Sequence, residues 1–234
     1  MDLFYHAGYM AVMKNNLNVL YEDNHIIVVV KPCNILSQSD NTGDIDMLSL
    51  VKSYIKEKYN KPGNVYIGLV HRLDRPTGGI MVFARTSKAA SRLSDDIKNN
   101  KMTKSYLAVI PSFFEKSGTF TDYLKKLDNG NSIVTSKDDG KYSELKYELI
   151  KEKSDLSLVK IDLRTGRHHQ IRVQFASRGY PLYGDQRYGK MDKKQLALFC
   201  YKLEFIHPVK KEKMSFTIYP DYGIFNFFKE CFYE

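Results

Sequence analysis

The chain has 234 residues, of which 43% are hydrophobic and 27% are charged, and its formal net charge at pH 7 is +9. This composition excludes a disordered or fibrous protein, and the longest strongly apolar run, residues 26–30, is far shorter than the roughly 20 residues of a transmembrane helix. The first 16 residues do not resemble a signal peptide, and three cysteines outside any Cys-x-x-Cys pair argue against a disulfide framework or a zinc site, so we expect a cytoplasmic protein without a membrane partner.

The first half of the chain is predicted to contain four strands and two helices. Apolar and β-branched runs predict the strands, which are expected over residues 18–22, 25–31, 65–70 and 80–84. Apolar residues at helical spacing predict the helices, which are expected over residues 47–59 and 87–98, the second with Ser87 as its N-cap. The loop HRLDRPTGG (71–79) lies between the third and fourth strands.

The second half is predicted to be richer in strands, which are expected over residues 104–110, 142–150, 156–163, 196–205 and 213–219. One helix should run to Ala176, with Thr165 as its cap and with Gly179 and Pro181 closing it. The aromatic tail, residues 225–233, is expected to form a helix packed on the core. Strands often follow strands without a crossover helix, so the fold class is predicted to be α+β.

The positive charge is concentrated in two segments. Residues 71–104 hold eight basic and three acidic groups, and residues 161–190 hold six basic and two acidic groups, so together they carry the whole excess. All nine arginines lie within these two segments. Arginine offers a planar fork that matches phosphate and carboxylate groups. We therefore expect the two segments to meet at one anionic site and the partner to be a polyanion.

Asp74 is the candidate for chemistry in the first segment, because Arg72 and Arg75 flank it. Nearby guanidinium groups lower the pKa of a carboxyl group and keep it ionised, and an ionised, partly desolvated carboxylate can act as a nucleophile or a base. The spacing alone also fits a surface ion-pair cluster, so the residues by themselves leave both interpretations open.

The second segment places Arg167 and Arg172 near the start of the predicted helix, where free backbone N–H groups bind anions. His168 and His169 are adjacent, and neighbouring helical positions point about 100° apart, so they are not expected to share a metal ion. His71 is expected to be a hydrogen-bonded loop residue rather than an acid–base catalyst.

Tyr106 lies on a predicted strand whose alternation puts Lys104, Tyr106 and Ala108 on one face. A tyrosine on a strand is usually half-buried packing. Beside an arginine-lined cleft it can instead stack on an RNA base.

Together these segments resemble the RluA-type family of pseudouridine synthases. The segments that carry the resemblance are LYEDNHIIVVVKPCNIL with its Lys31-Pro32 pair (20–36), HRLDRPTGG (71–79), KSYLA (104–108), TGRHHQIRV (165–173), Gly179, Pro181 and GDQRYG (184–189). They occur in the family's order, between about residue 18 and residue 219. HRLDR and GRxHQIR in one chain form a highly specific combination.

The resemblance implies a pseudouridine synthase fold, in which a central, mostly antiparallel mixed sheet is flanked by helices and loops and has an active-site cleft. Residues 1–17 would be an N-terminal extension and residues 18–234 one catalytic domain, without a separate N-terminal RNA-binding domain. The implied function is isomerisation of specific uridines in ribosomal or transfer RNA to pseudouridine. RNA would be the partner, no metal or cofactor would be needed, and the protein would be a monomer.

The resemblance also implies roles for individual residues. Asp74 is the expected nucleophile or sugar-proton base, Arg172 pairs with it and keeps it ionised, and Tyr106 stacks on the flipped uracil. The expected RNA-binding residues are Arg72, which would fill the vacated stack, the phosphate ligands Arg75, Arg164 and Arg167, and also Lys104, His169 and Gln170.

Four positions depart from the family pattern, none of them at the three expected catalytic residues. His168 stands where the family usually has Thr, Gln174 where it often has His, and Gly78 where Ser is commoner. Asn34 replaces the usual Gly after Lys-Pro, which is a mild change because Asn tolerates a left-handed backbone.

Two other functions fit parts of the sequence. An RNA-binding or ribosome-assembly protein would share the basic charge and the aromatic content, but it has no reason to keep a carboxylate in an anion-binding site. A hydrolytic glycosidase needs a second acid that neither motif segment supplies.

Overall fold

The computed structural model describes residues 17–112 and 115–232, and the chain divides into two compact units. The first unit contains the residues up to Met102 together with Phe205–Phe216, and the second contains Thr103–Glu204 and the residues from Thr217 onward. The extension expected at residues 1–17 lies almost wholly outside the described residues, as does Tyr233 of the tail.

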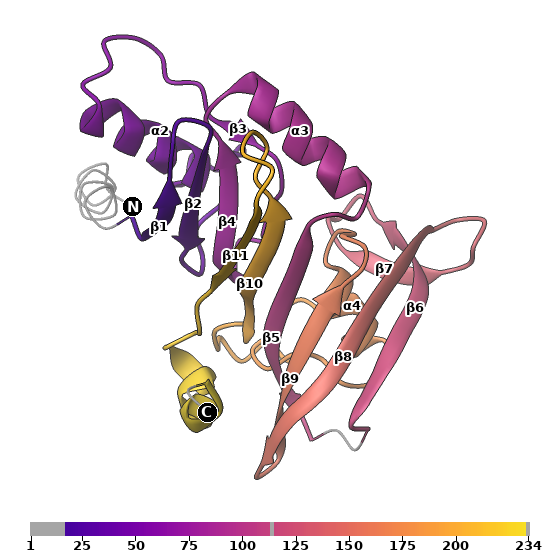
Figure 1. Cartoon of the computed structure of the whole chain (residues 1–234). Helices are drawn as coiled ribbons and strands as arrows, with labels where there is room; N and C mark the ends of the chain where they lie inside the picture. Colours follow the sequence, from indigo (N-terminus) through magenta and orange to yellow (C-terminus); the bar gives the residue numbers. More distant parts are fainter. Residues whose placement is uncertain (1–16, 113–114, 233–234) are drawn as a thin grey trace. The chain divides into compact units, whose positions relative to one another are not determined.

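The first unit is built on a small antiparallel sheet (Figure 1). Strand β2 (Ile26–Lys31) lies between β1 (Val19–Glu22) and β4 (Gly78–Ala84), in a register that sets Val28 opposite Val82. Every side chain of β4 and the first four of β2 are buried, which explains their nearly continuous apolar sequences. The two helices of this unit are α2 (Met47–Lys58) and α3 (Ser87–Lys98), both at the predicted positions.

The strand predicted over residues 65–70 is mostly absent, because β3 contains only Gly68–Leu69. It pairs with the end of β4, where Gly68 lies opposite Ala84. In an antiparallel register the residues before Gly68 would need partners beyond Ala84. There the chain leaves the sheet to begin α3, so the apolar run has no strand to pair with.

The N-cap of α3 is Thr86, one residue before the predicted Ser87, since the Thr86 side chain accepts a hydrogen bond from the N–H of Ala89 at 3.2 Å. The helix itself spans the predicted residues. Both residues can cap a helix, and the path of the chain out of β4 decides between them.

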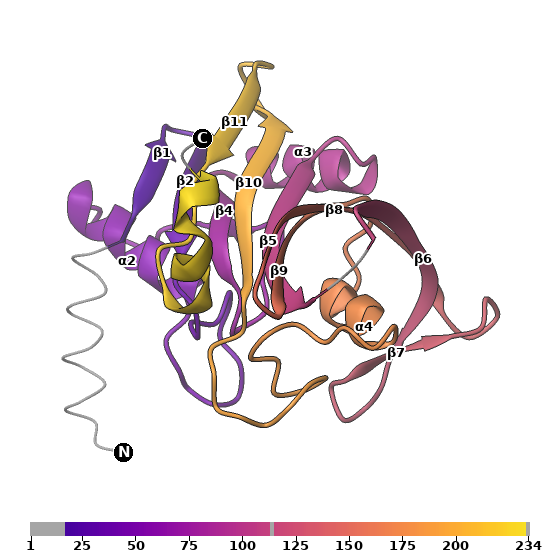
Figure 2. The ribbon, with the colours of Figure 1, turned by 90° about the horizontal axis from the view of Figure 1, so that it is seen from below.

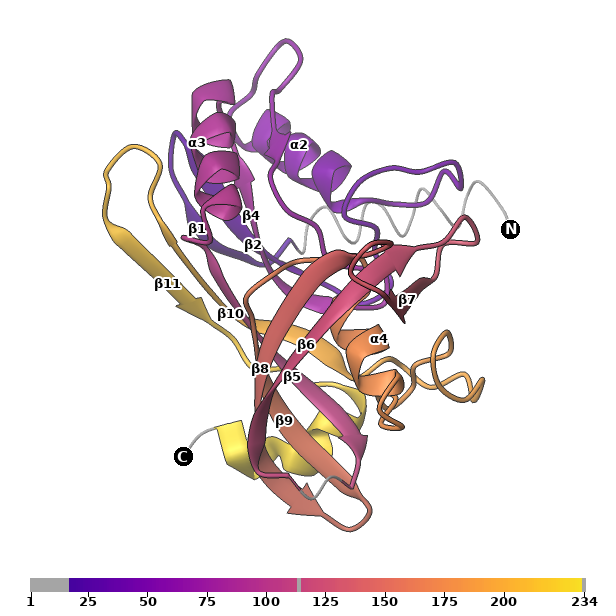
Figure 3. The same cartoon turned by 90° about the vertical axis from the view of Figure 1, so that its right-hand side faces the viewer.

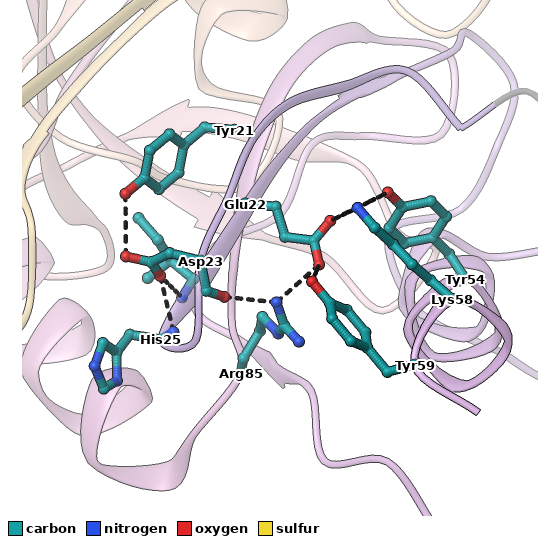
Figure 4. A network of polar contacts seen from close by, with 9 residues as sticks. Tyr21, Glu22, Asp23, His25, Tyr54, Lys58, Tyr59 and Arg85 are labelled. Atoms are coloured by element: carbon teal, nitrogen blue, oxygen red, sulfur yellow. Dashed lines mark hydrogen bonds and ion pairs between the residues drawn. The ribbon is translucent and has the colours of Figure 1, made fainter. Parts of the chain in front are cut away.

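Glu22 joins α2 to the sheet of the first unit (Figure 4). Its buried carboxylate accepts hydrogen bonds from Tyr59 at 2.6 Å, from Lys58 and Arg85 at 2.8 Å each, and from Tyr54 at 3.1 Å. Burial raises the pKa of Glu22, but these donors outweigh it and lower the pKa overall. Arg85 is therefore a structural residue rather than part of an anion-binding site.

The second unit is an antiparallel sheet that curls around one helix (Figure 2). Its strand order is β10 (Leu198–Ile206), β5 (Thr103–Pro111), β9 (Leu156–Leu163), β8 (Lys141–Lys153), β6 (Ser117–Lys126) and β7 (Ser132–Thr135). Helix α4 (Gln170–Ala176) lies on the concave side, where Phe175 packs against Phe120 of β6 and Tyr147 of β8. This places the core of the unit between the helix and the curved strands.

Strands β6 and β7 were not predicted from the sequence. Only Phe120 and Leu124 are buried among the ten residues of β6, so its apolar signal is too sparse to stand out. Its strand conformation depends on pairing with β8, which begins 15 residues after β6 ends and sets Leu145 opposite Phe120.

The chain ends with β11 (Lys213–Thr217) and the 3-10 helix η1 (Gly223–Phe232). In the second unit, η1 lies against β8 (Figure 3). It buries Phe225, Phe228 and Phe232, and Lys153 of β8 donates to the carbonyl of Phe227 at 2.9 Å. The aromatic tail is therefore packed, as expected, but as a 3-10 helix. Within the described residues, no helix is long and apolar enough to cross a bilayer.

Candidate active site

The loop that carries Asp74 is fixed at its backbone on both sides of this residue. Ser37 donates its hydroxyl to the carbonyl of Leu73 at 2.7 Å and accepts the N–H of Leu73 at 3.1 Å. The N–H of Thr77 donates to the carbonyl of Asp74 at 3.0 Å and closes a turn. His71 accepts the N–H of Val82 on Nε2 at 3.1 Å, as expected for a hydrogen-bonded loop residue. Asp74 thus sits, half-buried, on a rigid loop of the first unit.

Lys31 also fixes this loop, through the backbone of Arg75. It is fully buried, and its ammonium donates to the carbonyls of Pro32 and Arg75 at 3.0 Å each. Burial lowers the pKa of Lys31 to about 7, electrostatic interactions with Cys33 and Asp74 oppose this shift, and Arg75 adds to it. The Lys-Pro pair therefore joins the end of β2 to the residue that follows Asp74.

Asn34 has a φ of 65°, in the left-handed region. This left-handed backbone explains why the family usually has Gly at this position and why Asn can replace it.

Arg72 and Arg75 are both exposed, and Arg75 forms an ion pair with Asp44 at 2.7 Å.

In the second unit, Arg172 is clamped by Asp185, the aspartate of the GDQRYG motif. Arg172 is 4% exposed, and it donates from Nε to Oδ2 at 2.8 Å and from Nη2 to Oδ1 at 2.7 Å. Asp185 also accepts the N–H groups of Arg187 and Tyr188. Burial raises the pKa of Asp185, but the hydrogen bonds and charge of Arg172 and these two N–H groups outweigh burial and lower it.

The first glycine of the same motif is required by close packing. Gly184 has a φ of +71°, and a Cβ there would lie 2.2 Å from the carbonyl oxygen of Gln195. Only Gly lets the two backbones approach this closely. The tight turn at Gly184 places Asp185 within hydrogen-bond distance of Arg172.

Tyr106 is buried on β5, which lies between β10 and β9. It lies opposite Ile161 of β9 and Cys200 of β10, and Ile161 lies opposite Tyr147 of β8. Residues directly opposite each other on paired strands share a face, and Tyr147 contacts α4 through Phe175. Tyr106 therefore faces the side of the sheet that carries α4 and Arg172.

Lys104 shares that face by alternation along β5. Its ammonium lies 3.5 Å from where a Cβ on Gly166 would be, so it is close to the loop of residues 164–169. Burial lowers the pKa of Lys104, and the neighbouring Cys200 opposes this shift.

The cap predicted for α4 is wrong. The helix begins at Gln170 and its N-cap is His169, which has a φ of 54° and makes no side-chain capping hydrogen bond. Thr165 instead accepts the N–H of Glu144 and donates to the side-chain oxygen of Gln170, both at 2.8 Å. Gln170 also accepts the N–H of Arg167 at 3.0 Å and donates to the carbonyl of Glu144 at 3.1 Å. Gln170 therefore holds the loop of residues 164–169, called the motif loop below, against β8.

Arg164 and Arg167 lie exposed on this loop. Arg167 donates from Nε to the carbonyl of Tyr142 at 2.8 Å. Three other arginines bind protein groups: Arg85 binds Glu22, Arg92 binds the carbonyl of Pro208 and Arg178 binds Asp122. The clustering of arginines in two segments thus has a partly structural origin.

The two adjacent histidines do not diverge as helix neighbours would, because His168 and His169 precede the helix. Their ring centroids are 3.8 Å apart and the rings are tilted by 31°. Burial lowers the pKa of His169 to about 3, with further lowering by Arg172, His168 and Arg187 against the opposing charge of Asp185. Among the described residues, no group of three or more His, Cys, Asp or Glu is placed to hold a metal ion.

Several residues that build the site were not singled out from the sequence. They are Lys31 and Ser37, which fix the Asp74 loop, and Asp185, Tyr188 and Ser132, which surround Arg172 and His169. The Lys-Pro and GDQRYG motifs contained the signal for three of them. Ser37 and Ser132 lie in no recognisable pattern, and only tertiary contacts reveal them.

Comparison with known proteins identifies the family. A model described as RNA pseudouridylate synthase matches residues 25–177. A protein of Mycoplasma genitalium described as an uncharacterized RNA pseudouridine synthase is 36% identical, with 93% of this chain and 71% of that protein covered. A protein of Aquifex aeolicus with the same description is 32% identical, with 86% and 69% covered. The ribosomal large subunit pseudouridine synthase D of Borreliella burgdorferi is 34% identical, with 80% and 60% covered.

Solved structures agree on the fold. The human RNA pseudouridylate synthase domain containing 4 superposes with a TM-score of 0.77 at 18% identity and covers 96% of each chain. The human RNA pseudouridylate synthase domain containing 1 gives a TM-score of 0.71 at 20% identity, covering 90% of this chain and 86% of that one. The predicted α+β pseudouridine synthase fold is confirmed. Because the family model spans more than half of the residues and the bacterial relatives align along most of them, the chain belongs to the RNA pseudouridylate synthase family, in its RluA-type branch, and is an RNA pseudouridine synthase.

Proposed function

We propose that this enzyme isomerises specific uridines in ribosomal RNA and that Asp74 is its catalytic residue. Several relatives carry the printed names ribosomal large subunit pseudouridine synthase C or D, which supports a ribosomal substrate. Transfer RNA is the second substrate class. The observation that carries the assignment of Asp74 is its loop, in which Ser37 and Lys31 fix the backbone on both sides of a half-buried carboxylate.

The reaction breaks the bond between N1 of the ring and the sugar of uridine, turns the base and rejoins it through C5. The C5 hydrogen leaves as a proton and N1 gains one, so the overall change is an isomerisation. It needs a group that attacks the sugar or removes a sugar proton, and the Asp74 carboxylate serves in either role. Catalytic groups act best when their supporting residues are locked. The two hydrogen bonds of Leu73 to Ser37 and the Arg75 carbonyl bonded to Lys31 supply that support.

For Tyr106 and Arg172 we propose the roles that the family resemblance gives. Tyr106 stacks on the flipped uracil, and Arg172 stabilises the ionised form of Asp74. A guanidinium has five N–H donors, and two of those on Arg172 bind Asp185. The clamp supports the proposal because it fixes the direction in which the remaining donors point.

The exposed arginines Arg72, Arg75, Arg164 and Arg167 are proposed to bind RNA, and Lys104 to add positive charge beside the motif loop. For His169 and Gln170 we propose a positioning role instead of direct RNA contact. The polar atoms of Gln170 are engaged by Thr165, Arg167 and Glu144, and a low pKa keeps His169 uncharged.

The experiment compares Asp74→Asn with Asp155→Asn, a matched change in the exposed turn between β8 and β9. Tritium release from RNA labelled at uridine C5 should fall to background for Asp74→Asn and stay at the wild-type rate for Asp155→Asn. Wild-type turnover by Asp74→Asn would overturn the assignment. Mapping pseudouridines in total RNA from cells with and without the protein tests the substrate: loss of sites from ribosomal RNA is expected, and loss from transfer RNA alone would refute a ribosomal substrate.

A further inference from the structure

Tyr188 lies at the centre of a polar network around Arg172. The guanidinium of Arg172 lies over the Tyr188 ring, 5.2 Å from the ring centroid. The Tyr188 hydroxyl accepts the N–H of Ser132 at 2.7 Å and lies 2.8 Å from Nδ1 of His169. One aromatic side chain thus contacts the predicted catalytic arginine with its face and two other segments with its hydroxyl.

The direction of one of these hydrogen bonds follows from chemistry, since a backbone N–H only donates and the Tyr188 oxygen therefore accepts from Ser132. In the contact with His169, Tyr188 donates when the ring carries its proton on Nε2 and accepts when it carries it on Nδ1. Burial and the positive charges around His169 lower its pKa and keep the ring neutral, so one of its two nitrogens is an acceptor. The Tyr188 hydroxyl is therefore bound to two segments, which fix the position of the end of the side chain.

The β6–β7 hairpin supplies the fixed end of this network. Ser132 is 1% exposed, and its hydroxyl donates to the carbonyl of His168 at 2.8 Å and lies 3.0 Å from the His168 ring. Arg187 donates to the carbonyl of Gly130 at 2.9 Å and to the side chain of Asn131 at 3.0 Å. The hairpin is thus bound both to the residues before α4 and to the GDQRYG motif.

The two contacts of Arg172 restrain different motions. The paired hydrogen bonds to Asp185 fix the guanidinium within its own plane. They restrain tilting of that plane far less, and the face of the Tyr188 ring stands against such tilting. The ion pair and the cation–π contact together hold the arginine more completely than either contact alone.

We propose that Tyr188 is a positioning residue for Arg172 and that the β6–β7 hairpin holds Tyr188 in place through Ser132. This rests on the proposed catalytic role of Arg172. The hairpin, which carries no family motif, then belongs to the scaffold of the active site. Its contribution is to orient Arg172, and it need not touch the RNA.

The test is a double-mutant cycle with Tyr188→Phe and Arg172→Lys, measured by tritium release. Tyr188→Phe keeps the ring but removes the hydroxyl, so kcat should fall between about 10-fold and 100-fold, as small misplacements of catalytic groups do. KM should stay at its wild-type value. The melting temperature should fall by about 2–4 °C, because the N–H of the buried Ser132 loses its acceptor. In the Arg172→Lys background the same change should have an effect of less than about twofold, because the group it positions is gone.

Tyr147→Phe is the matched control. Tyr147 also packs against α4, but its hydroxyl binds Glu115. It should keep the wild-type kcat even if it melts earlier. Loss of kcat in Tyr188→Phe that is equal in both Arg172 backgrounds, or that only parallels a loss of melting temperature, would overturn the proposal.

His169→Asn gives a second route to the same answer. Asn tolerates the left-handed φ of 54° at this position, while the ring that binds the Tyr188 hydroxyl is removed. Its effect on kcat should not add to that of Tyr188→Phe, and full additivity would count against the network. Normal turnover by Arg172→Lys would disprove the role of Arg172 itself, whereas a defective Arg172→Lys beside a fully active Tyr188→Phe would disprove only this inference.

Discussion

Asp185 and Arg172 form a buried ion pair whose value lies in orientation as much as in stability. Removing two charges from water costs several kcal/mol per ion, and only good geometry and additional hydrogen bonds offset that cost. Here the carboxylate accepts two N–H groups of Arg172 and two backbone N–H groups. The arrangement holds the guanidinium at one place in the second unit.

Asp185→Asn should lower the free energy of unfolding by about 3–5 kcal/mol at pH 7, since it leaves a buried arginine without its counter-charge. Because folding lowers the pKa of Asp185, the stabilisation is present above the unfolded pKa of about 3.9 and is lost as pH falls through the folded value. Urea unfolding at several pH values should therefore show the wild type and Asp185→Asn converging below about pH 4. Asp155→Asn should stay within about 0.5 kcal/mol of wild type, and a pH-independent gap for Asp185→Asn would contradict this account.

The ends of the elements show how the chain path selects among residues of similar chemistry. Thr86 caps α3 although Ser87 follows it, and His169 precedes α4 although Thr165 is the better capping type. In the second case Thr165 binds Glu144 and Gln170 instead. Whether a threonine or serine hydroxyl caps a helix therefore depends on which backbone N–H groups lie within hydrogen-bond distance of it.

Thr86→Ala should lower the free energy of unfolding by about 1 kcal/mol, because it removes the acceptor for the N–H of Ala89. Ser87→Ala is the matched control on an exposed neighbour, and it should change stability by less than about 0.5 kcal/mol. Chemical denaturation of both variants distinguishes the two caps. A larger loss for Ser87→Ala than for Thr86→Ala would restore the cap predicted from the sequence.

Gly184→Ala should destabilise the second unit more than Gly179→Ala does. Both glycines have positive φ, so each alanine costs about 1–2 kcal/mol in backbone strain. A Cβ at Gly179 meets open space, whereas one at Gly184 lies 2.2 Å from the carbonyl oxygen of Gln195, which adds about 1–3 kcal/mol of overpacking. Equal melting temperatures for the two variants would show that the turn relaxes without cost.

For the whole molecule, the charge of +9 gains meaning from where the exposed arginines lie. Arg72 and Arg75 are on the Asp74 loop of the first unit, and Arg164 and Arg167 are on the motif loop of the second. Both loops thus carry exposed positive charge beside a residue proposed to act in catalysis. This distribution favours binding through phosphate contacts.

RNA affinity should therefore fall steeply with salt, by about 0.7–0.9 in log–log slope for each phosphate contact. Replacing both Arg164 and Arg167 by Gln should reduce the slope by about 1.5. Lys151→Gln, near the β8–β9 turn and away from the end of β8 that the motif loop contacts, is the control and should leave it unchanged. Binding isotherms between about 50 and about 300 mM salt measure this. An unaltered slope in the double variant would remove both arginines from the interface.

The sequence predicted those parts of the fold whose signal is local. The strands around Asp23, β5 and β9 have apolar runs, and helices α2 and α3 have apolar residues at helical spacing. All of these elements appear where they were expected. Strands β6 and β7 have few buried residues and exist because β8 pairs with β6. The strand predicted over 65–70 fails for the converse reason, since β4 ends before its residues find partners.

For the candidate site, the sequence by itself determined the family and the residues to examine, because HRLDR, KSYLA and the QIR and GDQRYG motifs are contiguous and specific. Tertiary structure alone decided that Asp185 clamps Arg172, that Ser37 and Lys31 fix the Asp74 loop, and that Ser132 reaches Tyr188. The physical reason is separation along the chain: Ser132 and Tyr188 are 56 residues apart and Ser37 and Leu73 are 36 apart. Such partners come into contact only after the strands between them have paired, so a local sequence pattern cannot predict the contact.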